Sequence, residues 1–551
     1  MINSVEFEYA INKLNTQLKA EKSSSNTYVK RFADNAKYTI FKSSANNVLK
    51  GRRGMGKTHM LKMLEEDLDS TFNKDRKMGV FVDLRDIKSV TQNNNSQCSE
   101  AIEYFRRFLE ELVFKIYEKL DNEYDNKINK IVLPITKRNR SILNLRKLRR
   151  KILDYTKDGR EWGLLDKEDQ VKTRKNAYSS GGKIGINSEL ISSFSQEDTI
   201  QNSRKLLRTF HFSDVCNYIK KIMKLAEVKE LFLLLDEWSE IPLDIQPYFA
   251  ECLKSTFFSI GKCHMKIAVI PYRTRFTMND NKLNPIGLEG SGEIFSIDLD
   301  DSLVLDRDKT ASEKFFTELL FKQLRGELKN SDKYLDNKGI VNKKFITDIF
   351  TKDTFLKLIR ASGGIPRDFL LIFIKSYNRH ISRKATKKIG ADDIMLGAKE
   401  WYNNDKVGDI KENGSNEYKL LNLIIEFVLS FPKKRVYFLV HPNMFEYVFF
   451  KRLIDLRLLH RIKETSSSKD NTQGVRYIMM ALDYGCYIEV LETRQEIDFS
   501  IENFEEEFHK INGDLLDTNR GTIRKRVLQE SVIEEHKKLI SKIEQVEVVN
   551  N

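Results

Sequence analysis

The feature that most constrains this chain is a glycine-rich loop at residues 51–58, which reads Gly-Arg-Arg-Gly-Met-Gly-Lys-Thr. It matches the phosphate-binding pattern G-x-x-x-x-G-K-[ST] at every position. A short apolar run at residues 48–49 precedes the loop, and apolar residues recur over 60–68 with the spacing of a helix buried on one side. The order of strand, loop and helix predicts a P-loop.

The backbone N–H groups of such a loop and the N-terminus of its helix converge on one point, which suits the phosphates of ATP. We expect Lys57 to reach the β- and γ-phosphates and the Thr58 hydroxyl to bind Mg²⁺. The predicted nucleotide-binding residues of this segment are Gly51, Arg52, Arg53, Gly54, Met55, Gly56, Lys57, Thr58 and His59.

A second segment, residues 231–237, is a continuous apolar run that ends in two carboxylates, the Walker B pattern. Such a run suits a central parallel strand covered on both faces, and the strand would deliver Asp236 to the sheet edge beside the loop. We therefore assign Asp236 to the magnesium shell. Glu237, one residue further, is the expected general base for an attacking water.

Three more apolar segments, residues 79–84, 266–270 and 294–299, are predicted strands of the same sheet. A helical pattern over 101–120 lies between two of them. The predicted fold class is α/β: a P-loop NTPase parallel sheet flanked by helices, with the nucleotide at its carboxyl edge.

Helical patterns follow the sheet at residues 312–328 and 343–358. In the segment 361–370, two glycines end one helix and Pro366 begins the next. Arg367 then lies in the first helical turn, a fixed position from which a guanidinium can reach a phosphate. An arginine on the protein surface is the alternative interpretation of this position.

The last third of the chain predicts a winged-helix domain. Its pattern is helix at 420–427, strand at 435–440, helix at 442–459, and a hairpin formed by 459–464 and 475–482. The helix from 442 is rich in apolar residues, so part of it is expected in the core, and DNA and protein both stay open as ligands. The cations that could follow a DNA backbone are Lys451, Arg452, Arg457, Arg461, Lys463 and Lys469.

The separation of Lys57 from Asp236 is longer than one strand and its helices require, which predicts an insertion at about 121–210. Cations crowd residues 137–151 of that insertion without an acidic residue between them. This run is typical of a solvated helix face, a nucleic-acid contact or a protein docking site. The formal charge of +14 suits double-stranded DNA as a partner and equally suits solubility.

The loop at 51–58, the acidic strand end at 231–237 and the Gly-Gly-Ile-Pro-Arg of 363–367 together resemble AAA+ ATPases, in particular the origin-recognition-complex initiator branch and related bacterial defence-type ATPases. The resemblance implies that Arg367 is a sensor-2 arginine in a helical lid, that residues 391–398 belong to the last lid helix, and that a winged helix follows.

The chain departs from this family after the strand at 266–270. The family usually has a small polar sensor residue there, whereas this chain reads Pro-Tyr-Arg-Thr-Arg at 271–275. Thr274 is one candidate sensor. Arg273 or Arg275 is alternatively a finger that completes the site of a neighbouring copy in a homo-oligomer.

The predicted domains follow from these patterns. They are an N-terminal helical segment at 1–40, a P-loop ATPase core at 41–305 containing the insertion at about 121–210, a helical lid at 306–405, a winged-helix-like domain at 412–500 and a helical tail at 501–551.

The predicted function is an ATPase that binds and hydrolyses ATP with Mg²⁺ and changes conformation or assembly to act on DNA or a partner protein. The alternative is a STAND-like signalling ATPase in bacterial anti-phage defence that controls a separately encoded effector protein. Glu237 argues against a scaffold that binds ATP without turnover. The chain has no leader-like N-terminus, no bilayer-length apolar run and no paired cysteine motif, which predicts a cytoplasmic protein without a membrane partner.

Overall fold

The computed structural model describes part of the chain. The residues it describes are 2–16, 18, 35–87, 97–128, 147, 150, 212–278, 285–290, 292–300, 308–384, 388–413, 415–429, 436–464, 477–493, 527–528 and 530–550. The basic run at 137–151 lies outside them except for Lys147 and Arg150, and so does the predicted insertion beyond residue 128 apart from the same two residues.

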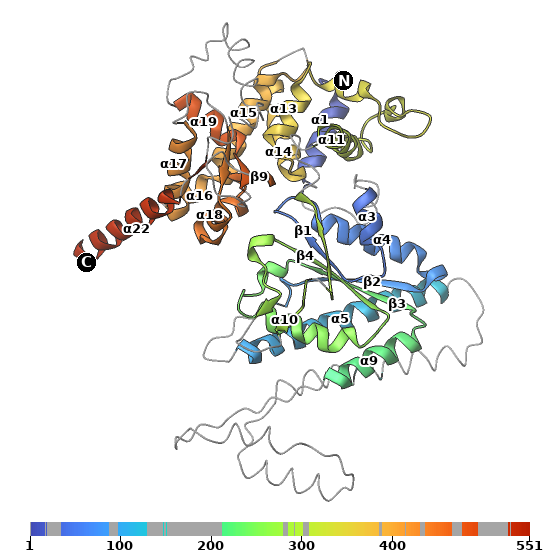
Figure 1. Cartoon of the computed structure of the whole chain (residues 1–551). Helices are drawn as coiled ribbons and strands as arrows, with labels where there is room; N and C mark the ends of the chain where they lie inside the picture. The colour runs from blue at the N-terminus through green and yellow to red at the C-terminus, as the bar shows by residue number, and fades with distance from the viewer. Residues whose placement is uncertain are drawn as a thin grey trace, which may run out of the picture.

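A five-stranded parallel sheet forms the centre of the first half, in the order β2-β3-β4-β1-β7 (Figure 1). All five predicted strands are confirmed. Their bounds are β1 Asn47–Lys50, β2 Lys77–Asp83, β3 Glu230–Asp236, β4 Cys263–Val269 and β7 Phe295–Asp298. A small hairpin of β5 Thr277–Met278 and β6 Ile286–Gly287 lies outside this sheet.

Helices cover both faces of the sheet (Figure 1). Phe232 and Leu234 of β3 belong to one core with the helix that follows the loop, whereas Leu233 and its alternate neighbours belong to a second core on the opposite face. This double coverage explains why β3 is apolar throughout. The helices are α4 Lys57–Asp75 on the first face, and α5 Gln97–Ile128, α9 Phe212–Leu225 and α10 Gln246–Leu253 on the second. α3 Asn35–Phe41 precedes β1.

The lid is a separate group of helices above the sheet (Figure 1). The single helix predicted over 343–358 is wrong, because the chain breaks at Phe350 and turns through a left-handed Asp353 with φ 62°. The N-terminal helix α1 Val5–Thr16 lies on the lid, where the Phe7 and Tyr377 rings are 5.5 Å apart. The lid helices are α11 Lys309–Leu324, α12 Lys343–Ile349, α13 Thr354–Ala361, α14 Pro366–Ser382 and α15 Ala391–Trp401.

The C-terminal domain combines helices with a four-stranded sheet in the order β11-β8-β10-β9. The helix predicted over 442–459 is wrong in its extent, because extended Tyr447 separates a short 3-10 turn, Pro442–Glu446, from the helix proper. The elements are α16 Gly408–Glu412, α17 Asn416–Leu429, β8 Tyr437–Val440, α18 Val448–Asp455, β9 Leu459–Glu464, β10 Ile478–Leu482, α19 Tyr484–Thr493, β11 Val527–Leu528 and α22 Ser531–Asn550. Helices and a β9–β10 hairpin make this domain a winged helix.

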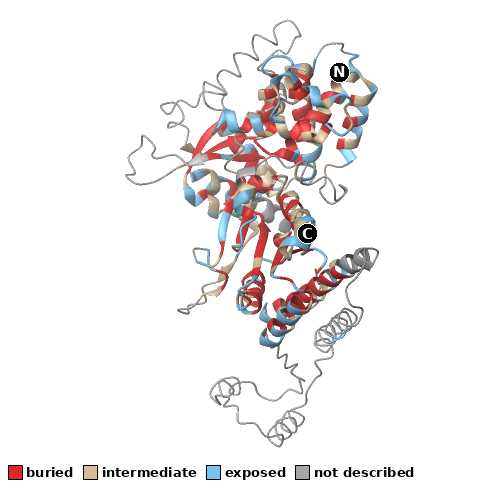
Figure 2. Ribbon diagram, turned by 90° about the vertical axis from the view of Figure 1, so that its right-hand side faces the viewer, coloured by how far each residue is buried: buried red, intermediate tan, exposed pale blue. Residues whose placement is uncertain are grey.

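One hydrophobic core runs from α4 through the lid into the winged-helix domain, and Figure 2 shows buried residues along the sheet and the inner faces of these helices. The lid and the C-terminal domain meet closely where α19 begins. A Cβ atom on Gly485 would lie 2.5 Å from the Ala398 carbonyl oxygen of α15. The two domains are therefore in direct contact. Among the described helices, none is long and apolar enough to span a bilayer.

Candidate nucleotide site

The P-loop connects β1 to α4 through two glycines in left-handed conformations, Gly54 at φ 90° and Gly56 at φ 87°. Non-glycine residues adopt this region at a steric cost, which accounts for glycine at both positions. The backbone N–H of Arg367 donates to the Gly54 carbonyl oxygen at 3.2 Å. The first turn of α14 therefore rests directly on the loop, as expected for a lid helix.

Lys57 begins α4, and its side chain is turned back onto the loop. Its Nζ donates to the carbonyl oxygens of Gly51 at 2.7 Å and Arg52 at 3.0 Å. Burial lowers the pKa of Lys57, while the carboxylates of Asp236 and Asp300 oppose that shift. The residue predicted to bind phosphate is thus held by carbonyl groups and has carboxylates beside it.

Asp236 ends β3, and its side chain is only 2% exposed. Its Oδ1 accepts the Glu237 N–H at 3.0 Å, and its Oδ2 is buried without a hydrogen-bond partner in the described part of the chain. Burial raises the pKa of Asp236 to about 6, although the Thr58 hydroxyl and Lys57 act in the opposite direction. A buried carboxylate oxygen that lacks a donor, with a hydroxyl beside it, fits a hard cation such as Mg²⁺.

A complete protein cage for a metal is absent from the described residues, which contain no group of three or more His, Cys, Asp or Glu side chains able to hold one. Mg²⁺ commonly binds proteins through one or two protein oxygens and completes its shell with phosphate and water. Asp236 and Thr58 suit that sparse arrangement. A metal here would depend on a bound nucleotide for its remaining ligands.

Glu237 follows Asp236 in a left-handed conformation with φ 55°, which begins the turn Trp238–Glu240. Glu237 is partly exposed, and its charge acts on both Lys57 and Arg367. The three residues therefore surround one region at the carboxyl edge of the sheet. The role of Glu237 as a base stays a prediction.

The other predicted loop residues differ in exposure. Met55 is 3% exposed, and its N–H donates to the Arg52 carbonyl oxygen at 3.3 Å. Arg53 is exposed and acts electrostatically on Arg367, whereas His59 is partly buried in the first turn of α4.

The segment after β4 is engaged within the chain at each of its three candidate residues. The Thr274 hydroxyl donates to the Ile270 carbonyl oxygen at 2.7 Å, and the Arg275 N–H donates to Gln246 Oε1 at 2.7 Å. Arg273 forms an ion pair with Asp455 of α18. Their predicted sensor and finger roles remain predictions.

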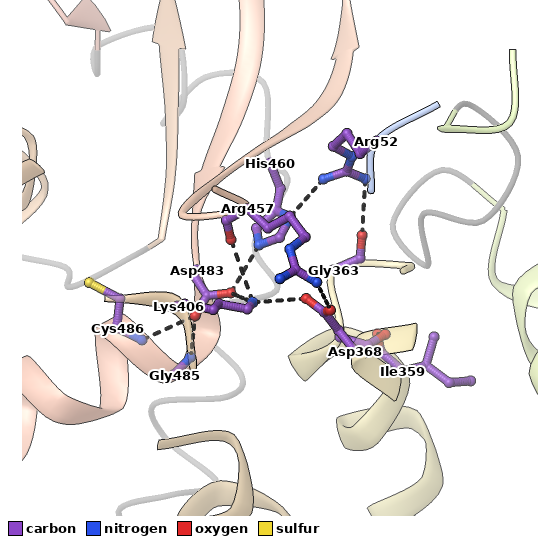
Figure 3. Close-up of polar contacts among 11 residues, drawn as sticks. Arg52, Ile359, Gly363, Asp368, Lys406, Arg457, His460, Asp483, Gly485 and Cys486 are labelled. Carbon is purple, nitrogen blue, oxygen red and sulfur yellow. Dashed lines mark hydrogen bonds and ion pairs between the residues drawn. The ribbon is translucent and has the colours of Figure 1, made fainter. Parts of the chain in front are cut away.

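The Arg52 side chain extends toward the lid and the winged-helix domain, a direction that its place in the phosphate-binding loop does not predict. Its guanidinium is buried, with Nη1 2.7 Å from His460 Nδ1 of β9 and Nη2 donating to the Gly363 carbonyl oxygen at 3.4 Å (Figure 3). Both carboxylate oxygens of Asp300, just beyond β7, accept its backbone N–H at 3.1 and 3.2 Å. Arg52 therefore joins the loop to the lid and to the winged helix.

Behind Arg52 lies a buried polar network that the sequence did not predict (Figure 3). His460 Nε2 is 3.1 Å from Asp483 Oδ2, which also contacts Lys406 Nζ at 2.6 Å. Lys406 in turn lies 3.0 Å from Asp368 Oδ2 at the start of α14, and Arg457 pairs with the other oxygen of that carboxylate. Burial would raise the pKa of Asp483, but Lys406 and His460 outweigh it and lower that pKa.

The basic side predicted for the winged helix is not a single exposed surface. Arg457 points inward to Asp368, whereas Arg452 and Arg461 are exposed, and Lys469 lies outside the described residues. The Phe445 ring stacks on Tyr272 of the segment after β4, with centroids 5.9 Å apart. Part of this domain's surface around α18 is therefore occupied by the ATPase core.

Comparison with solved structures finds 38 matching chains, two of which are described here. No family model matches the chain, and no curated protein matches it. The Aeropyrum pernix ORC2 protein, solved with ADPNP and ADP, shares 8% identity at a TM-score of 0.31 and covers 86% of this chain and 93% of its own. The Aeropyrum pernix ORC1 protein in complex with DNA shares 8% identity at a TM-score of 0.25 and covers 89% and 92%.

These scores are too low to support an argument, so the fold assignment depends on the chain's own geometry. That geometry consists of the parallel sheet, the glycine loop after β1, the acidic end of β3 and the helices packed over them. The chain has the fold of a P-loop NTPase with a helical lid and a C-terminal winged helix.

Proposed function

We propose that this chain is an AAA+ type ATPase that binds ATP and Mg²⁺ between the P-loop and the lid, hydrolyses the nucleotide and changes its domain arrangement in response. The observation that carries the proposal is the buried Oδ2 of Asp236, which has no hydrogen-bond partner among the described residues and lies beside Thr58 and Lys57. A structural carboxylate would be expected to have its oxygens satisfied. This one is suited to a cation.

The proposed roles follow from position. The loop N–H groups and the N-terminus of α4 bind the phosphates, and Lys57 leaves the Gly51 and Arg52 carbonyls to join them. Thr58 and Asp236 hold Mg²⁺, which would neutralise charge on the phosphate oxygens. Glu237 accepts a proton from the attacking water, and Arg367 contacts the terminal phosphate from the lid.

The proposal includes a homo-oligomer in which Arg273 or Arg275 completes a neighbour's site. For Arg273 this requires that it leave Asp455, since it is paired within its own chain. Double-stranded DNA is the proposed partner of the basic insertion and the winged helix. A cytoplasmic location stays a prediction of the sequence.

The second candidate is the STAND-like switch that controls an effector protein in anti-phage defence. The observation that favours it is the winged helix packed on the nucleotide loop through Arg52 and His460, with Phe445 covered by Tyr272. A domain held in this way is better suited to reporting nucleotide state than to lying freely on DNA.

ATP hydrolysis by the purified protein tests the proposal, measured with and without double-stranded DNA at low and moderate salt. We expect Lys57→Ala to lose ATP binding and Glu237→Gln to bind ATP with little turnover. Unchanged nucleotide affinity in Lys57→Ala would remove the loop assignment, and normal turnover in Glu237→Gln would mean another base. Stimulation by DNA that declines with salt favours the DNA-coupled ATPase. Indifference to DNA favours the protein-sensing switch.

A further inference from the structure

In the described part of the chain, a buried hydrogen bond between Arg52 and His460 joins the nucleotide loop to the winged-helix domain, and its protonation can be assigned. An arginine guanidinium only donates, so His460 Nδ1 must accept from Arg52 at 2.7 Å. The ring proton then lies on Nε2 and is donated to Asp483 at 3.1 Å. His460 is therefore neutral here, and burial together with Arg52 lowers its pKa.

The same arginine is fixed from its backbone side. Asp300 accepts its N–H and also pairs with its Nε at 3.3 Å, and its carbonyl oxygen accepts from Lys57 Nζ at 3.0 Å. If Lys57 turns to a phosphate, the Arg52 carbonyl loses this donor and keeps only the longer hydrogen bond from the Met55 N–H at 3.3 Å, so the peptide that carries the guanidinium is less restrained. Arrival of a triphosphate is thus linked through one residue to the contact with His460.

We infer that Arg52 couples nucleotide occupancy to the docking of the winged-helix domain, with ATP binding and the docked arrangement opposing each other. This inference rests on the nucleotide binding proposed above. Because coupling between two sites is reciprocal, a change that undocks the domain must also tighten ATP binding. That second effect is what a merely structural contact would not produce.

Two variants away from the phosphates release the domain in different ways. His460→Ala removes the acceptor for Arg52. Gly363→Ala adds a Cβ that would lie 2.6 Å from the His460 ring, at a position with φ 59°. Gly339→Ala is the matched control, because its φ of 74° imposes similar backbone strain while its Cβ meets no atom within 4 Å.

The experiment measures the Kd of ATP by calorimetry and hydrogen exchange of peptides covering α18 and β9 in the full chain. We expect ATP to increase exchange in these peptides in the wild type. His460→Ala and Gly363→Ala should show that increase without ATP and bind ATP about fivefold more tightly or better, whereas Gly339→Ala should match the wild type. In an Arg52→Ala background, adding His460→Ala should leave the Kd of ATP unchanged.

Three outcomes overturn the inference. They are faster exchange in His460→Ala or Gly363→Ala with an unchanged Kd, protection of α18 and β9 by ATP, and a full effect of His460→Ala in the Arg52→Ala background. If the wild type binds no ATP at all, the proposed function fails and this inference with it. ATP binding without coupling removes the inference alone, so the two failures are distinguishable.

Discussion

The Cβ atom that Gly54 lacks would lie 2.8 Å from the Cβ of Arg367, so the absence of a side chain in the loop sets how closely the lid helix approaches it. The 3.2 Å hydrogen bond from the Arg367 N–H to the Gly54 carbonyl oxygen depends on that close approach. A position that the P-loop pattern leaves variable is thus constrained by the lid.

Gly54→Ala is expected to displace the start of α14 and weaken ATP binding by at least tenfold. The left-handed conformation alone costs alanine about 1 to 2 kcal/mol, and the contact with Arg367 adds to that cost. Calorimetric titration with ATP measures the effect, with Gly339→Ala as the control for backbone strain. Wild-type affinity in Gly54→Ala would show that the lid contact does not position the loop.

Asp236→Asn is expected to stabilise the nucleotide-free protein while removing Mg²⁺-dependent ATP binding. Burial raises the pKa of Asp236 from 3.8 to about 6, so between these values the folded chain binds more protons than the unfolded chain. Stability therefore falls as pH rises through this window and stays lower above it. The asparagine side chain does not ionise and therefore avoids this loss in the free energy of unfolding, which is at most about 3 kcal/mol at pH 8.

Urea unfolding of Asp236→Asn and the wild type at several pH values measures this difference. The free energies of unfolding should differ most at pH 8 and converge as the pH approaches 4. A gap that is constant with pH would mean that Asp236 is not the titrating group.

The docking of the winged helix is expected to weaken in acid. The groups that face His460 are Arg52, Lys406 and Asp483, and its pKa is lowered from the usual 6.5. As the pH falls, His460 is therefore protonated at a higher pH in the undocked domain than in the docked one. Docking is unaffected above pH 6.5 and is lost progressively below it. Each pH unit below 6.5 weakens docking by up to tenfold until the lowered pKa is reached.

Hydrogen exchange of β9 across pH 5 to 8, corrected for the intrinsic rate, reports this loss. His460→Gln is the comparison, because glutamine keeps an acceptor without titrating near neutral pH. Identical pH profiles for the two proteins would contradict the assignment of a neutral His460.

The local sequence pattern was sufficient to predict the helices and strands that hold the predicted site. The strand before the loop, the acidic end of β3 and the start of α14 at Pro366 all lie where the sequence places them. Each depends on neighbouring residues alone, such as a glycine pair, a proline or an uninterrupted apolar run. The break at Tyr447 was missed because apolar residues continue through it and conceal the change in backbone.

The polar network could not be predicted for a different reason. Arg52 and His460 are 408 positions apart, and each is unremarkable in its own segment. An arginine in a glycine loop indicates a phosphate ligand, and the strand Leu459–Glu464 is mostly polar, so nothing in it indicates that its histidine is buried. Only the packing of the winged helix on the lid brings them together, and that packing depends on surfaces assembled from several helices.

Arg367 and Asp368 are consecutive residues of α14, yet they serve different neighbours. The Arg367 backbone is bonded to the nucleotide loop, while the Asp368 carboxylate contacts Lys406 and Arg457 of the C-terminal half. Successive residues of an α-helix are separated by about 100° around its axis, so the two contacts lie on different sides of one rigid turn. Any tilt of α14 must change both contacts together, and the geometry of the lid therefore limits how independently the winged helix can respond to nucleotide.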